Sequence, residues 1–143
     1  MITQFLAPYL NDEGIADFTP SGDLFVGYMP DSPDNCIALY EESGIIEGYQ
    51  QAYGSDWMGF MVMVRGNQVW AQDKIWEIHT NILGLNERYF DKMYIKVIQV
   101  QTTPQQIELD DKGRAEFTSH YMALVNTFDN THRFSVTEPI TQP

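Results

Sequence analysis

The stretch Trp57-Met58-Gly59-Phe60-Met61-Val62-Met63-Val64, followed at once by Arg65-Gly66-Asn67, decides the fold. Its first eight residues are apolar on both faces, which predicts a central strand covered on each side. The Arg-Gly-Asn sequence ends the strand, and Asn67 is a suitable cap for a helix expected over 67–85. One apolar stripe runs along that helix and consists of Ala71, Ile75, Ile78, Ile82 and Leu85. The stretch therefore predicts a sheet with one long helix against it.

The residues before this stretch predict a second helix and two strands. Apolar positions from Ile2 to Leu10 recur with the spacing of one helix face, although Pro8 lies among them, and Gly14 is a typical stop. Strands are expected over 24–29 and 36–40, separated by a turn rich in proline and aspartate. Residues 41–56 are expected to form a loop or a weak edge element.

Two or three further strands are expected after the long helix. Residues 93–100 are rich in β-formers, and Pro104 is expected to interrupt them. Asp110-Asp111-Lys112-Gly113 predicts a hairpin turn in which glycine takes a positive φ. Residues 115–125 then alternate between apolar and polar side chains, which predicts a strand with one buried face. The predicted fold class is α+β, a mostly antiparallel sheet packed against an N-terminal helix and one long central helix.

The length of the chain, 143 residues, suits one domain. We assign residues 1–127 to that single domain. Residues 128–143 lose the apolar periodicity and contain two prolines, so they are expected to form a C-terminal tail or arm.

The net charge of −12, from 8 basic and 20 acidic residues, excludes several classes of protein. It opposes general binding to a nucleic-acid backbone or to an anionic membrane surface. No apolar run approaches the roughly 20 residues of a membrane span, and the first residues lack the pattern of a signal peptide. The lone cysteine, Cys36, excludes an internal disulfide and most metal clusters, and it is expected to be a small core residue.

Histidine and carboxylate pairs do not form a recognisable catalytic motif. His79 lies on the apolar side of the long helix, where a packed and hydrogen-bonded histidine is expected. Asp73 and Glu77 share a helix face, which solvent exposure explains better than acid–base chemistry. His120 and His132 are too scattered along the chain to complete a ligand set.

The aspartates in the turns at 31–34 and 110–111 raise the question of a bound cation. Calcium loops need more oxygen ligands at closer spacing, and turn formation explains both clusters. We therefore expect no catalytic, cofactor-binding or metal-binding residues, no cofactor, and no enzymatic activity.

Several features suggest contacts with other subunits. Methionines recur in the central strand, and the segments 41–56, 101–113 and 128–143 lack a core period yet carry aromatic and aliphatic side chains. Ordinary loops and core-filling methionines would explain the same features. The candidate interface residues are Tyr49, Tyr53, Ile107, Asp110, Asp111, Arg114, Phe128, Phe134 and Ile140.

The order of the motifs resembles a known family. The sequence Pro-Asp-Ser-Pro-Asp-Asn-Cys-Ile-Ala-Leu-Tyr at 30–40 enters a strand, Val64-Arg65-Gly66 leaves one before the helix, and Asp-Asp-Lys-Gly-Arg-Ala-Glu-Phe at 110–117 forms a hairpin. This arrangement, over about residues 2–126, resembles the small minor capsid or tail terminator proteins of long-tailed bacteriophages.

The resemblance implies a structural virion protein that is not an enzyme. Six copies would form a ring that closes the tail tube and offers the head-tail joining surface. The implied partners are other copies of the chain, the tail tube protein and a head-completion or connector protein. DNA would pass through the lumen without specific binding, and an acidic lumen suits the charge of the chain. The implied location is the tail or neck of the virion, assembled in the host cytoplasm, with no membrane contact.

Two other functions stay open at this point. One is a head-completion or connector protein in the neck of the same virion. The other, from a different class, is a small soluble enzyme or ligand-binding domain, which would need a pocket with convergent polar groups.

Overall fold

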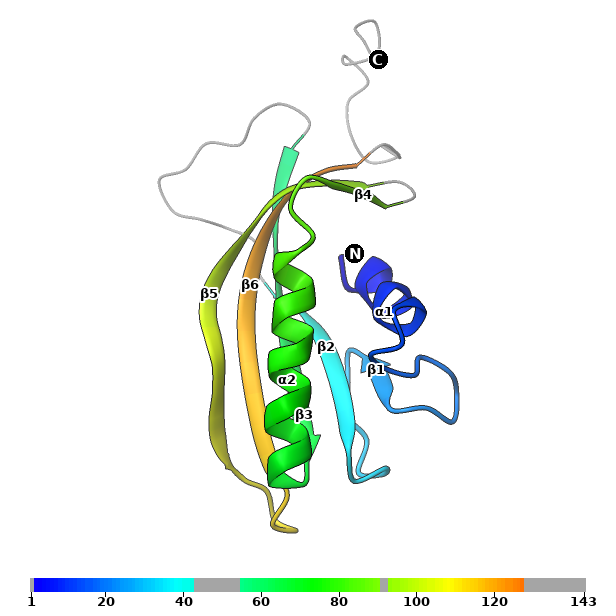
Figure 1. Ribbon diagram of the computed structural model, residues 1–143, viewed down its shortest axis with the longest axis vertical. Coiled ribbons are helices and arrows are strands. Elements are labelled where there is room, and N and C mark those ends of the chain that lie inside the picture. The colour runs from blue at the N-terminus through cyan, green and yellow to red at the C-terminus, as the bar shows by residue number, and fades with distance from the viewer. Residues whose placement is uncertain (1, 43–54, 91–92, 128–143) are drawn as a thin grey trace, which may run out of the picture.

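The computed structural model describes residues 2–42, 55–90 and 93–127, which form two helices and one six-stranded sheet (Figure 1). The elements follow one another as α1 (Ile2–Asp12), β1 (Leu24–Val26), β2 (Cys36–Glu42), β3 (Ser55–Gly66), α2 (Gln68–Leu83), β4 (Arg88–Phe90), β5 (Met93–Leu109) and β6 (Ala115–Thr127). The strand order in the sheet is β1-β2-β3-β6-β5-β4. The sheet is mixed, because β1 pairs with β2 in parallel while the other pairings are antiparallel. The α+β class is confirmed.

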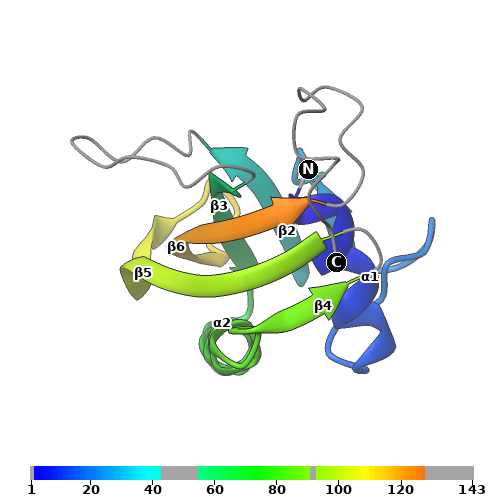
Figure 2. The ribbon, with the colours of Figure 1, turned by 90° about the horizontal axis from the view of Figure 1, so that it is seen from above.

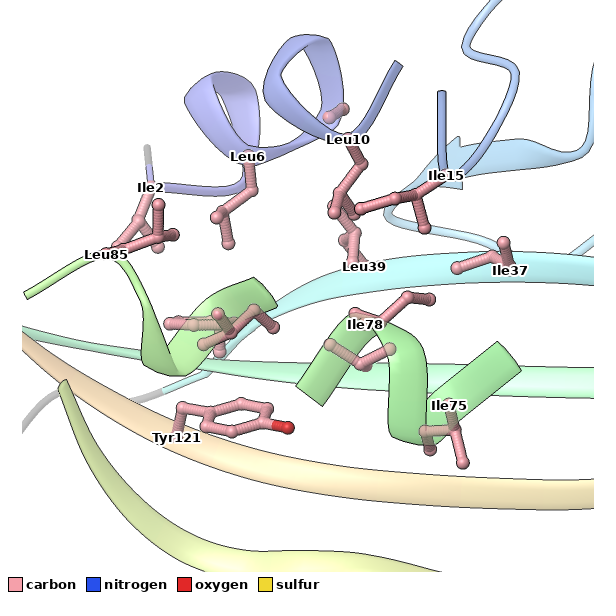
Figure 3. Packing of buried hydrophobic residues seen from close by; sticks show 14 of the residues in the cluster. Ile2, Leu6, Leu10, Ile15, Ile37, Leu39, Ile75, Ile78, Leu85 and Tyr121 are labelled. Atoms are coloured by element: carbon pink, nitrogen blue, oxygen red, sulfur yellow. The ribbon is translucent and has the colours of Figure 1, made fainter. Parts of the chain in front are cut away.

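The sheet curls around the two helices, which pack on the same face of it (Figure 2). Leu6 and Leu10 of α1, Ile75 and Ile78 of α2, and the inward side chains of the strands form one apolar cluster (Figure 3). Thr3 also ties α1 to the sheet, since its N–H and Oγ1 donate to Glu41 Oε2 at 2.8 and 2.6 Å. The core therefore lies between the helices and one face of the sheet.

The central strand is confirmed, and its two faces are covered to different degrees. Phe60, Val62 and Val64 point to the helices and are fully buried. Met61 and Met63 point to the other face and are half-buried, because neither described helix packs there. The apolar run alone could not distinguish a face covered by a helix from one that is partly open.

The long helix begins as its cap predicts. Asn67 Oδ1 accepts hydrogen bonds from the N–H groups of Val69 and Trp70 at 3.1 and 3.4 Å, and the helix ends at Leu83 before the cap residue Gly84. The N-terminal helix runs through Pro8 and stops before Gly14, whose φ is +75°.

Several predicted boundaries need correction. β5 is not interrupted at Pro104 but continues to Leu109, because the register with β6 shifts beside Pro104 and the strand has a free outer edge where a missing N–H is tolerated. Segment 101–113, which lacks a core period, is thus the end of a strand followed by a turn. β2 extends to Glu42 and β3 begins at Ser55, which shortens the expected loop at 41–56. Strand β1 ends at Val26. The rest of that loop, and the predicted tail 128–143, lie outside the described residues.

Candidate interaction site at the arginine end

Two turns that are far apart in the sequence meet at one end of the sheet. They are the turn 31–35 before β2 and the hairpin 110–114 between β5 and β6, and we call them, together with Arg65 at the end of β3, the arginine end. In Figure 1 the hairpin and the start of β2 lie at the bottom.

Arg65 fixes the turn 31–35 through hydrogen bonds to its backbone. Its side chain is buried, and its guanidinium donates to the backbone carbonyls of Asp31 at 3.2 Å, Pro33 at 2.6 Å and Asp34 at 3.3 Å. The register that pairs Cys36 with Arg65 puts the guanidinium beside this turn. Arg65 therefore donates hydrogen bonds to three carbonyls of a turn that is not paired with any strand.

Arg114 joins the two turns. Its Nε donates to Asp110 Oδ2 at 2.8 Å, its Nη2 to Asp31 Oδ1 at 2.9 Å and its Nη1 to Asp34 Oδ1 at 3.0 Å. Nη1 also donates to the Asp31 carbonyl at 2.7 Å. The Arg114 side chain is only 11 % exposed, so three carboxylates surround one largely covered cation.

The hairpin turn itself is confirmed. The Gly113 N–H donates to the Asp110 carbonyl at 2.9 Å, and Gly113 has a φ of +79°. Asp110 Oδ1 accepts from the N–H groups of Lys112 and Arg114 at 3.0 and 2.8 Å, and Lys112 Nζ forms an ion pair with Asp31 Oδ2.

The pKa values of these groups follow from the contacts. Hydrogen bonds from Lys112 and then Arg114 lower the pKa of Asp31 below its ordinary value. Burial would raise the pKa of Asp110, but the hydrogen bonds from Arg114 and Lys112 outweigh it and lower that pKa. Partial burial opposes the charge on Arg114, yet the three aspartates raise its pKa. All of these groups are therefore ionised near neutral pH.

The arginine end is suited to recognition rather than to catalysis. The carboxylates of Asp31, Asp34 and Asp110 are each paired with a cation, while Asp31 and Asp34 remain largely open to solvent. Within residues 2–42, 55–90 and 93–127, no group of three or more histidine, cysteine, aspartate or glutamate side chains is placed to hold a metal ion. What results is a charged surface of fixed geometry.

The histidine, carboxylate and cysteine side chains that could carry catalysis have ordinary packed or solvent-exposed surroundings. His79 is buried, and its Nδ1 lies 2.7 Å from the Tyr121 hydroxyl, as predicted for a packed histidine. Burial lowers the pKa of His79 and raises that of Tyr121 to about 12.

Asp73 and Glu77 are exposed, and Glu77 pairs with Lys74 at 3.0 Å. Burial raises the pKa of the Cys36 thiol, although Arg65, a neighbour that the sequence pattern did not reveal, acts in the opposite direction.

The predicted interface residues fall into two groups. Ile107 and Asp111 are exposed, whereas Asp110 and Arg114 are mostly covered and paired with each other. The other five, Tyr49, Tyr53, Phe128, Phe134 and Ile140, lie outside the described residues. Sequence reasoning missed Arg65 and the pairing of Arg114 with Asp31, since no local pattern signals a contact across 83 positions.

Two pockets on the surface of the described residues are large enough for a small ligand. One, beside β1, is lined by Phe18, Thr19, Pro20, Leu24, Phe25, Val26 and Tyr28. The other, between α1 and β4, is lined by Gln4, Phe5, Pro8, Tyr9, Asp12 and Phe90. Their walls are mainly apolar and aromatic, without the convergent polar groups that position a substrate.

The curled sheet, the helices on one face and the charged end define a small structural domain of the α+β class. The sequence matches the family model described as bacteriophage tail terminator protein over residues 9–127, and the chain belongs to this family. It is therefore a structural protein of the phage tail and a component of the virion. No curated protein matched the chain. Neither described helix has the length and apolar character needed to cross a membrane.

Proposed function

We propose that six copies of the chain form a ring that closes the finished tail tube and provides the surface on which a head-completion or connector protein docks. The observation that carries this proposal is the family match over residues 9–127. The family makes the chain a tail protein, and the word terminator in its description supports a role at the end of the tube.

The arginine end supports the docking part of the proposal. A joining surface must keep its shape when a partner arrives, and here two arginines fix both turns through hydrogen bonds. Asp31, Asp34 and Asp111 remain exposed on it and can meet a partner's cations. Charged groups of this kind give orientation and rate of association more than affinity.

The net charge supports the position around a DNA conduit. A charge of −12 on each copy repels a passing duplex, so the lumen need not bind DNA. The same charge opposes assembly at low ionic strength. The free chain is therefore expected to assemble on a tube end or at high salt.

Imaging of assembled particles tests the proposal. Particles that carry a tagged copy of the chain should show a ring of label at the junction of the tail tube with the head. Tubes assembled without the chain should lack a defined end and vary in length. Label on the portal side alone would favour the connector alternative, and label along the whole tube would contradict the proposal.

The family also points to a protein without catalytic activity. A screen of the purified chain for hydrolase activity and cofactor binding should be blank. Reproducible turnover that is lost on changing Asp73 or Glu77 would contradict this expectation.

A further inference from the structure

Helix α2 runs lengthwise beside β5 and is tied to it at both ends. At the start of the helix, the side-chain amides of Gln68 and Gln106 exchange two hydrogen bonds of 3.0 and 3.2 Å. Just past the end of the helix, Asn86 Oδ1 accepts from the backbone N–H of Ile98 at 2.6 Å. The helix therefore follows β5 from about residue 106 back to residue 98 (Figure 1).

The outer edge of β5 is open over most of this length. One side of β5 pairs with β6, and on the other side β4 covers residues 93–95 alone. Because Ile98 donates to Asn86, its N–H points away from β6 and marks that outer edge. From residue 99 to Leu109, the described residues supply no backbone partner on this side. Such an edge is a template for another strand.

The opposite edge of the sheet is formed by β1, and it offers little room for another strand. Strand β1 is only three residues long, and the Asp17 carbonyl accepts from the N–H groups of Asp23 and Leu24 at 3.0 and 3.1 Å. β5 is thus the sheet edge that has room for a further strand.

An apolar stripe on α2 lies next to the open edge. Val69, Trp76 and Leu83 are seven residues apart, so they share one side of the helix, and they are 67, 45 and 39 % exposed. At about 100° per residue, Trp76 lies about 80° from Gln68, which faces β5. It lies about 160° from Lys74, which reaches the Ile15 carbonyl on the α1 side. The stripe thus flanks β5, and we call the stripe and the open edge together the α2–β5 flank.

We propose that residues 133–137 of a neighbouring copy add to this flank as an extra strand. The segment Arg133-Phe134-Ser135-Val136-Thr137 alternates polar and apolar residues, is rich in β-formers, and ends before Pro139. On a strand beside β5, Phe134 and Val136 would share the face toward α2 and cover the apolar stripe. Arg133 would also bring a cation to an edge whose exposed charge is Glu108.

Reach favours a neighbouring copy over the chain's own tail. Thr127 pairs with Met93 at the top of β5, and Ser135 is eight residues further on, so it can extend at most about 29 Å from there. Gln105 is twelve residues down β5, or about 40 Å along the strand. A head-to-tail contact of this kind, repeated around a closed circle, makes a ring. The inference rests on the proposed ring and goes beyond the family match, which ends at residue 127.

Disulfide cross-linking between two separately labelled populations tests the inference. One population carries Ser135→Cys and the other Gln105→Cys, and the buried Cys36 stays out of reach of both. After mixing, assembly at high salt and mild oxidation, a disulfide-linked dimer containing one chain of each population should form. Asp73→Cys, on the exposed side of α2 away from the core, is the matched control and should give no such dimer.

The outcomes separate this inference from the proposed function. Rings without the Ser135–Gln105 dimer, or with equal cross-linking at the control position, would overturn the inference and leave the ring intact. Failure of the unmodified chain to form rings at high salt or on tail tubes would overturn both.

A second variant removes the stripe without touching the core. Trp76→Ser should weaken assembly about tenfold or more, because a large aromatic residue at the centre of a contact carries much of its energy. Asp73→Ser on the same helix should assemble normally. Normal assembly of Trp76→Ser with an unchanged melting temperature would contradict a contact at the flank.

Discussion

The arginine end and the α2–β5 flank differ in how many of their polar and apolar groups find partners within the described residues of the chain. At the arginine end, Arg65 and Arg114 use their donors on carbonyls and carboxylates of the same chain. At the flank, a strand edge and three apolar side chains on α2 have little cover from the described residues. Within the described residues, the first region pairs most of its charged and polar groups, whereas the second leaves a strand edge and apolar side chains exposed.

This difference predicts opposite consequences of mutation. Changes at the arginine end should lower the stability of the isolated chain. Changes at the flank should leave stability almost untouched and act on assembly. A subunit of a ring needs both kinds of region, since its rigid surface must exist before assembly and its contact surface must stay available until then.

The largest loss of stability is expected for Arg65→Met. The variant leaves the carbonyls of Pro33 and Asp34 without the arginine donor and removes one of the two donors to the Asp31 carbonyl, which Arg114 also reaches. A buried polar group that loses its partner costs roughly 1–3 kcal/mol. Chemical denaturation should show a loss of about 3 kcal/mol in the free energy of unfolding. The control Arg88→Met removes an exposed arginine of β4 and should change stability by less than about 0.5 kcal/mol. Equal effects of the two variants would show that Arg65 does not hold the turn.

Gly113→Val should have the next largest effect. A Cβ at this position meets no atom within 4 Å, so the cost comes from the backbone, whose φ of +79° disfavours a branched residue by about 1–2 kcal/mol. Gly113→Asn is the matched control, because asparagine tolerates this conformation. A valine variant as stable as wild type would mean that the turn can adopt another shape.

His79, which lies beneath Trp76, predicts a pH dependence. Burial lowers its pKa, so the folded chain keeps the ring neutral while the unfolded chain takes up a proton below about pH 6.5. The free energy of unfolding therefore does not depend on His79 above about pH 6.5. It decreases as the pH falls below that value, by at most about 1.4 kcal/mol per pH unit. His79→Gln should remove this slope, and the control His120→Gln, at the exposed pair with Glu42, should retain it. A slope that persists in His79→Gln would assign the effect to another group.

Much of the fold could be predicted because its signals are local. The Asn67 cap, the apolar stripe of α2 and the Asp110–Gly113 turn each lie within a few residues, and each is confirmed. The run of β5 past Pro104 could not be predicted, since it depends on which edge of the strand is paired.

The candidate site was harder to predict for the same reason. The sequence points to Asp110, Asp111 and Arg114 from one turn, but Arg114 also contacts a second turn about 80 positions away, which Arg65 holds as well. The open flank depends on the relative placement of α2 and β5, which no periodicity encodes.

Deletion of residues 128–143 tests most directly the central claim that the chain completes its burial against other copies. The truncated chain should keep its melting temperature to within about 2 °C, because the described core ends at β6. At high ionic strength, where the charge of −12 is screened, the full chain should form rings and the truncated chain should remain monomeric by native mass measurement. A truncated chain that unfolds would place the tail in the core of the domain. A truncated chain that still forms rings and ends tails normally would contradict the claim.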